Sequence, residues 1–227
     1  MTVAENLAGV RRAIEAAARR SDRAPGDVTL VAVTKTWPAD VALEAIDAGA
    51  TDLGENRAQE FRDKVMLLGD KARWHFIGHL QTNKVRHVVG SCALIHSVDR
   101  PGLAESIARR AAAAGAEQDV LIEVNVAGDP NKHGVEPARA VALALEVQAL
   151  EGVRVRGLMT MPPYAEDPEL SRPHFKDLAA LSTQLVAELP GAGALSMGMS
   201  HDFEVAIEEG ASIVRVGTAI FGPRSAG

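Results

Sequence analysis

Cysteine is almost absent from this sequence, which has one, Cys92, among its 227 residues. A single cysteine rules out an intramolecular disulfide framework and suits a reducing compartment. Aromatic residues are also scarce, at 4%, and the net charge is acidic, at −6. The sequence has no basic stripe interleaved with aromatic residues, so the protein is not expected to bind nucleic acid.

Long hydrophobic runs are missing as well. No apolar segment approaches the length that crosses a bilayer, and the N-terminus lacks the core of a signal peptide. The basic segment RRAIEAAARR, residues 11–20, has apolar residues at helical spacing, which favours a solvated helix face over a membrane anchor. These absences predict a soluble, cytoplasmic protein without a membrane partner.

What is present is an alternation of two patterns, in which short runs rich in β-branched residues alternate with amphipathic stretches. Strands are expected at 28–34, 51–54, 74–80, 93–98, 120–126, 153–161, 194–199 and 212–217. Helices are expected at 3–20, 38–48, 56–68, 82–89, 101–114, 136–150, 169–188 and 202–209. Prolines at helix starts and glycines just after helix ends support these boundaries.

Eight strands alternating with helices predict parallel βαβ units. The number favours a closed (β/α)8 barrel of TIM type over an open, doubly wound sheet, and residues 3–20 add an extra N-terminal helix. No G-x-G-x-x-G follows the first strand, which removes the usual dinucleotide fingerprint. Because no linker or low-complexity tract interrupts the series, residues 1–227 are expected to form a single α/β domain.

Polar residues gather directly after the expected strands. In such a barrel the carboxyl ends of all strands meet at one mouth, where ligands bind. Each residue alone has an ordinary explanation, such as a helix N-cap or a buried histidine, but the whole set predicts a ligand site. The set is Lys35, Glu55, Asn56, His79, Gln81, Asn83, Lys84, His96, Ser97, Asp99, Glu123, Asn125, Ser200, His201, Asp202, Arg215, Gly217 and Thr218.

The last two turns have the composition of a phosphate cradle. In GMSHD, Ser200 is expected to cap the helix at 202–209, and VGTAIFG adds Gly217 and Thr218 after the last strand. Backbone amides and small hydroxyls after the seventh and eighth strands form the usual phosphate site of this fold. Two ordinary tight turns would explain the same residues equally well.

Lys35 ends the first expected strand, and its amine either reaches water or serves chemistry. A lysine that is desolvated in a pocket loses its proton more readily and can add to an aldehyde as a Schiff base. If such a lysine faces a phosphate cradle, two kinds of ligand fit the site. One is pyridoxal 5′-phosphate (PLP), and the other is a phosphorylated sugar in an aldolase.

Seven segments resemble, in the same order, the YggS/PROSC family of PLP homeostasis proteins: VAVTKTWP, LGENRAQE, WHFIGHLQTNK, IHSVD, VNVAGDPNKHGV, GLMTMPP and LSMGMSHDFEVAIEEGASIVRVGTAIFG. The resemblance covers about residues 5–224 and implies the fold of the alanine racemase N-terminal barrel. Trp37 and NRAQE depart from the family pattern and bear on the shape of the pocket entrance. The implied PLP-binding residues are Lys35, as a covalent aldimine, with Asn56, Ser200, Arg215, Gly217 and Thr218.

The resemblance also implies a role for each of these residues. Asn56 lies near the cofactor ring, Arg215 faces the pyridine nitrogen, and the last two turns hold the phosphate. An arginine at that place is permanently charged and donates only, so it favours an unprotonated nitrogen and weakens the electron sink that carbanion chemistry needs. The only tyrosine, Tyr164, lies in the loop after the sixth strand, as a loop anchor or a poor second base.

A non-catalytic PLP-binding protein of intracellular PLP homeostasis is therefore predicted, with no catalytic residue and no metal ligand. The alternative is a PLP-dependent amino-acid racemase or transaminase of low activity. The expected partners are PLP and PLP-dependent apo-enzymes, and the protein is expected to be a monomer.

Overall fold

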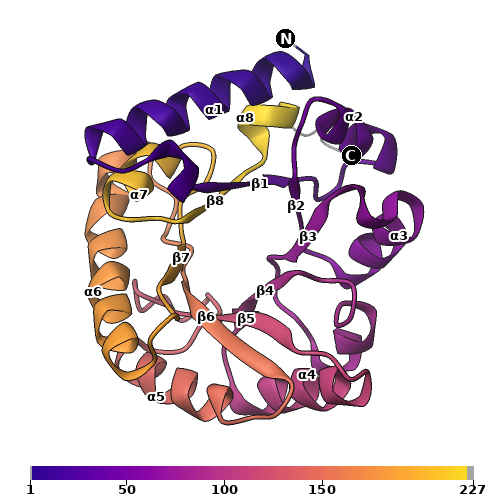
Figure 1. Cartoon of the computed structure of the whole chain (residues 1–227). Coiled ribbons are helices and arrows are strands. Elements are labelled where there is room, and N and C mark those ends of the chain that lie inside the picture. Colours follow the sequence, from indigo (N-terminus) through magenta and orange to yellow (C-terminus); the bar gives the residue numbers. More distant parts are fainter. Residues whose placement is uncertain (1, 224–227) are drawn as a thin grey trace.

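The expected strands close into a barrel in the computed structural model, which describes residues 2–223. Each strand pairs in parallel with the next along the chain, and β8 returns to pair with β1 (Figure 1). The predicted (β/α)8 barrel is thus confirmed. Its strands are β1 Thr29–Val33, β2 Asp52–Glu55, β3 Arg73–Phe76, β4 Leu94–Val98, β5 Gln118–Glu123, β6 Val153–Met159, β7 Ala194–Ser196 and β8 Ile213–Val216.

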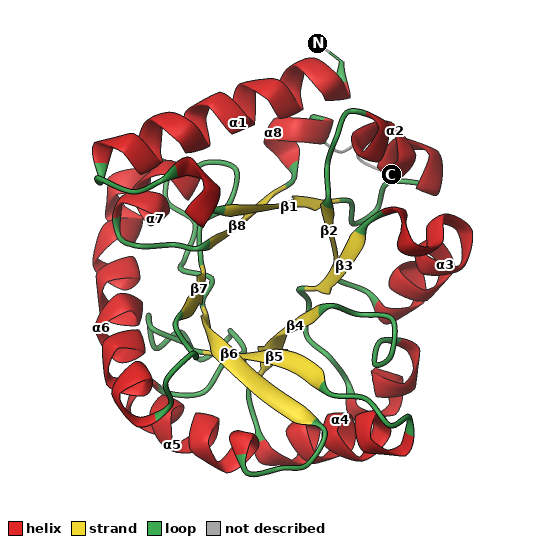
Figure 2. Ribbon diagram, in the orientation of Figure 1, coloured by secondary structure: helices red, strands yellow, loops and turns green. Residues whose placement is uncertain are grey.

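Helices form a ring outside the barrel (Figure 2). They are α1 Val3–Arg20, α2 Ala39–Asp47, α3 Ala58–Leu68, α4 Pro101–Ala113, α5 Pro137–Gln148, α6 Arg172–Glu188, α7 Phe203–Glu208 and α8 Thr218–Phe221. Short 3-10 helices are η1 Pro25–Asp27, η2 Gly69–Lys71, η3 Thr82–His87 and η4 Pro168–Ser171. Within residues 2–223 no helix is both long enough and apolar enough to cross a membrane.

The helix expected at 82–89 is present as the 3-10 helix η3, and the helix α8 was not expected from the sequence. α8 has four residues, and so short a segment has too few periodic positions for its pattern to stand out.

The extra N-terminal helix α1 is confirmed and packs beside α7 and α8, next to the seam between β1 and β8 (Figure 1). A capping box starts it, because Thr2 Oγ1 accepts from the Glu5 amide at 3.2 Å and Glu5 accepts from the Thr2 amide at 2.8 Å. Farther along, Asn6 donates to the Ile220 carbonyl at 2.8 Å. The helix therefore holds α8, which follows the last strand.

Apolar side chains fill two layers of very different size. The larger layer lies between the strands and the helices and includes Leu53, Trp74, Phe76 and Leu195. The smaller cluster, inside the barrel, consists of Val31, Leu94, Leu121, Met159 and Ile213. Since side chains alternate along a strand, the neighbours of the outer-layer residues face inward, and several of them are polar.

Candidate functional site

Lys35 follows β1 at the carboxyl end of the barrel and is half-buried. The next residue, Thr36, has a left-handed backbone with φ of +69°. This conformation is strained for a β-branched residue. The Thr36 amide donates to a carboxylate oxygen of Glu60 at 2.8 Å, so α3 holds the turn in place. The structure thus fixes the backbone on which Lys35 stands.

A buried ion pair lies beside this turn. Lys64 on α3 donates to the Thr34 carbonyl at 2.7 Å and is also bonded to Glu55 Oε1. The Thr34 hydroxyl donates to the same oxygen at 2.6 Å. Burial raises the pKa of Glu55, while the charge of Lys64 opposes the rise. The ends of β1 and β2 are therefore tied to α3 by charges that water does not reach.

Asn56 follows β2, and its side-chain oxygen Oδ1 is buried without a hydrogen-bond partner in the described part of the chain. Asn56 lines a cavity of about 310 Å³ together with Arg57, Ala58, Gln59, His79, Leu80, Gln81 and Lys84. Gly78 passes so close that a Cβ there would lie 2.2 Å from the Asn56 carbonyl oxygen. Only glycine lets the loop after β3 approach Asn56 in this way.

The turns after β7 and β8 meet at Ser200. Its hydroxyl oxygen accepts from the backbone amides of Gly217 at 3.2 Å and Ala219 at 3.3 Å. The prediction that Ser200 caps the helix at 202–209 is wrong, because Asp202 occupies the N-cap position of α7. Amides of one turn thus point at a hydroxyl of the other, and Thr218 lies exposed between them. A group rich in acceptor oxygens is what these donors suit.

Arg215 on β8 shares its inward-facing side with Ile213 and is 3% exposed. It donates to the Ser196 hydroxyl at 2.5 Å and to the Thr160 carbonyl at 2.8 Å. Burial lowers the pKa of Arg215 to about 10, against the opposing charges of Glu123 and Asp202. Its guanidinium nevertheless stays charged at neutral pH.

Glu123 ends β5 and is 3% exposed. Burial raises its pKa to about 7, the charge of Asp99 adds to the rise, and Arg215 opposes it. A buried carboxyl that titrates near neutrality can both take and give a proton. The sequence placed Glu123 at the mouth, but its shifted pKa depends on Asp99 in the loop after β4 and on Arg215 of β8.

The hydrogen bonds of Arg215 continue through the barrel interior. Ser196 Oγ lies 2.8 Å from His96 Nδ1, and His96 Nε2 lies 3.0 Å from His75 Nδ1. His75 Nε2 lies 2.9 Å from Asp52 Oδ1, at the opposite end of the barrel. Ser196, His75 and Asp52 were not predicted as functional residues. A sequence signal existed, since each is a polar residue at an inward position of its strand.

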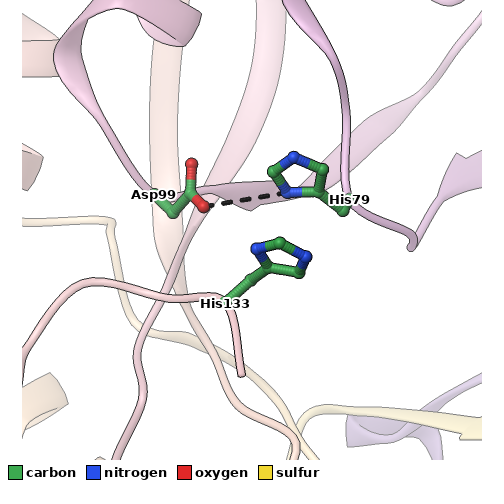
Figure 3. A group of neighbouring side chains, drawn as sticks. All are labelled: His79, Asp99 and His133. Atoms are coloured by element: carbon green, nitrogen blue, oxygen red, sulfur yellow. Dashed lines mark ion pairs between the residues drawn. The ribbon is translucent and has the colours of Figure 1, made fainter. Parts of the chain in front are cut away.

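His79, Asp99 and His133 approach one another at the mouth, from the loops after β3, β4 and β5 (Figure 3). Their donor atoms all lie within 4.8 Å of one another, and His79 Nδ1 lies 3.9 Å from Asp99 Oδ2. The two rings are stacked, with centroids 3.8 Å apart and planes 14° apart. Since an imidazole binds a metal in its ring plane, parallel rings do not point at one ion as they stand.

Tyr164 and Lys84, which the sequence analysis singled out, lie in the segments that follow β6 and β3. Tyr164 is 74% exposed, and its ring lies 4.7 Å from that of His201, next to Ser200. Lys84, on η3, lines the cavity at Asn56. Among the predicted binding residues, the structure brings Ser200 and Gly217 into direct contact. Lys35, Asn56 and Arg215 follow or belong to other strands that open at the same mouth.

Known proteins are similar to this chain over nearly its full length. The family described as "Alanine racemase, N-terminal domain" matches residues 6–225. The Pyridoxal phosphate homeostasis protein of Aquifex aeolicus is 49% identical over 226 residues, which cover 99% of each chain. That of Escherichia coli K12 is 40% identical over 230 residues, which cover 98% of this chain and 97% of the relative.

A solved structure is similar over a comparable span. PipY of Synechococcus elongatus, with PLP bound, has a TM-score of 0.84 and 34% identity, and the match covers 97% of this chain and 100% of that chain. The chain belongs to the family of pyridoxal phosphate homeostasis proteins, whose fold is that of the alanine racemase N-terminal domain.

Proposed function

We propose that this protein binds PLP at the carboxyl end of its barrel, attached covalently through the amine of Lys35, and acts in PLP homeostasis. The observation that carries the proposal is the set of groups around one mouth. A half-buried lysine, a turn of backbone amides and a buried arginine match the aldehyde, the phosphate and the ring nitrogen of PLP.

The residues present fit this cofactor on their chemistry. The amides of Gly217 and Ala219, with the hydroxyls of Ser200 and Thr218, supply donors for a phosphate. The buried oxygen of Asn56, which lacks a partner within residues 2–223, supplies an acceptor for a bound ligand. When bound, PLP supplies an aldehyde that captures amines and a ring that withdraws electrons.

Binding without turnover is the function that the surroundings of Arg215 favour. A buried, charged, donor-only group holds a ring nitrogen unprotonated, and an unprotonated ring is a poor electron sink. Tyr164 is exposed on the loop after β6, so it does not resemble a base fixed in a pocket. The protein would then hold PLP, limit the free aldehyde and supply it to apo-enzymes, as a monomer in the cytoplasm.

One observation favours the alternative of slow racemase or transaminase chemistry. Glu123 is a buried carboxyl whose pKa of about 7 suits proton transfer, and the charge of Arg215 acts on it. This candidate requires turnover of an amino acid at an enzymatic rate. A cofactor-free aldolase would instead use Lys35 without any chromophore.

The test is to add PLP to the purified protein and record its visible spectrum before and after borohydride. We expect a yellow band that borohydride removes, with the label on the Lys35 peptide. Lys35→Ala should lose the band and keep its circular dichroism spectrum, since Lys35 lies at the mouth and its loss leaves no core cavity. The control Lys71→Ala, on an exposed lysine of η2 away from the mouth, should keep the band. An unchanged band in Lys35→Ala, or label on another lysine, would refute the proposal.

A further inference from the structure

A continuous row of polar side chains crosses the interior of the barrel, where such folds are usually packed with branched apolar residues. Its members are Asp52, His75, His96, Ser196 and Arg215, from β2, β3, β4, β7 and β8. All are at most 5% exposed. Each neighbouring pair is within 3.0 Å, so the row is one hydrogen-bond chain that runs from one end of the barrel to the other.

The two ends of the chain determine which way its hydrogens point. Arg215 only donates, so the Ser196 oxygen accepts from it. At the other end, Asp52 also receives hydrogen bonds from Arg73 Nε at 2.8 Å and from the Thr51 hydroxyl at 2.7 Å. Although burial opposes the shift, hydrogen bonds from His75, Thr51 and Arg73 lower the pKa of Asp52 to about 2. Asp52 is therefore a carboxylate that only accepts, and His75 Nε2 carries a hydrogen.

The middle of the chain follows from these ends. With a neutral His75, its Nδ1 accepts from His96 Nε2, and His96 Nδ1 then accepts the hydroxyl hydrogen of Ser196. Every hydrogen in the chain has an acceptor in this arrangement, and all of them point from Arg215 toward Asp52.

The competing arrangement has a protonated His75, which would donate to His96 and reverse the next bond. The Ser196 oxygen would then accept from both His96 and Arg215. The hydroxyl hydrogen of Ser196 would then have no acceptor, because His96 Nδ1 is the one acceptor that the described residues provide for it. A buried hydroxyl without an acceptor is costly. The chain with two neutral histidines is therefore favoured.

We propose that Asp52, His75, His96 and Ser196 are positioning residues that hold Arg215 in place and keep both histidines neutral, so that no proton reaches the ring nitrogen of the cofactor along this path. This inference rests on the proposed PLP function. It adds that Asp52 takes part in setting the protonation state of the cofactor ring. Asp52 lies at the far end of the barrel, 163 positions before Arg215 in the sequence.

Charged groups lie at both ends of this hydrogen-bond chain. Arg73 contacts Asp52 at the far end, and its side chain is 66% exposed. Glu123 and Asp202 act on Arg215 at the mouth, and His96 is affected by His75 and Arg215. Burial, with these two neighbours, lowers the pKa of His96 well below its usual value.

The first experiment needs no cofactor. In ligand-free protein with ¹⁵N-labelled imidazoles, NMR should find hydrogen on Nε2 and none on Nδ1 in both His75 and His96. Ser196→Ala removes the hydrogen bond that His96 Nδ1 accepts, so it should shift the ¹⁵N signal of that nitrogen, while Ser182→Ala, a buried serine on α6 outside the chain, should change nothing. A protonated His75 or hydrogen on Nδ1 of either wild-type ring would overturn the proposed direction.

The second experiment adds PLP labelled with ¹⁵N in its ring. In wild-type protein the ring nitrogen should stay unprotonated between about pH 6 and 9. Ser196→Ala should let it titrate and should raise the Kd of PLP at least fivefold, whereas Ser182→Ala should match the wild type. If Ser196→Ala leaves both readouts unchanged, the positioning role is wrong. If wild-type protein binds no PLP, the proposed function fails, while the first experiment still decides the chain.

Discussion

Replacing Lys64 by methionine should destabilise the protein in a way that depends on pH. The variant removes the cation that pairs with Glu55, which is 0% exposed. Methionine keeps most of the side-chain volume of lysine. Breaking a buried pair by removing one partner costs about 3–5 kcal/mol, because the other charge remains without compensation. Burial already raises the pKa of Glu55 against the opposing charge of Lys64, so removing Lys64 should raise that pKa further.

The sign of the pH dependence follows from this shift. A carboxyl with a raised pKa in the folded state holds a proton that the unfolded chain releases above about pH 4.3. Unfolding therefore becomes easier as the pH rises, by up to about 1.4 kcal/mol per pH unit, until Glu55 also ionises in the folded state. The loss relative to wild type should be small at pH 5 and should approach about 3–5 kcal/mol at pH 8.

Urea unfolding followed by circular dichroism at pH 5, 6.5 and 8 measures this loss. Lys71→Met, on an exposed lysine of η2, is the matched control and should be within about 0.5 kcal/mol of wild type at each pH. The double variant Lys64→Met with Glu55→Gln should regain most of the loss, because no buried charge remains. A loss that is the same at all three pH values would refute the reasoning, as would a double variant no more stable than the single one.

Two further predictions concern the cofactor. Alanine at Ser200 and Thr218 should weaken binding of PLP more than binding of unphosphorylated pyridoxal. The difference should be about 1.5–3 kcal/mol for each hydroxyl that bonds a charged oxygen. Equal losses for both ligands in a fluorescence titration would show that these hydroxyls do not bind phosphate. Arg215→Glu should permit protonation of the ring nitrogen and raise the exchange of an amino acid's α-hydrogen with deuterated water, per bound PLP. Wild-type turnover of an amino acid at about 1 per second or faster would contradict a carrier function.

The sequence alone determined the architecture and the residues at the mouth. Strand and helix patterns are local properties, since they depend on β-branched runs, amphipathic spacing, and proline and glycine at the boundaries. Eight such units in order specify a barrel, and a barrel places the residue after each strand at one end. For this reason Lys35, Asn56 and Glu123 could be assigned to the mouth from the sequence alone, whereas the four-residue helix α8 could not be recognised.

Only the tertiary structure decided which of these residues touch. Ser200 accepts from amides 17 and 19 positions away, although its local sequence predicted a helix cap. His96 meets Ser196 across 100 positions, and the Glu55–Lys64 pair depends on the packing of α3 against two strand ends. Such contacts follow from the register of the closed barrel, which sets the height of each inward side chain. Register is a property of strand pairing between distant segments, so no local pattern contains it.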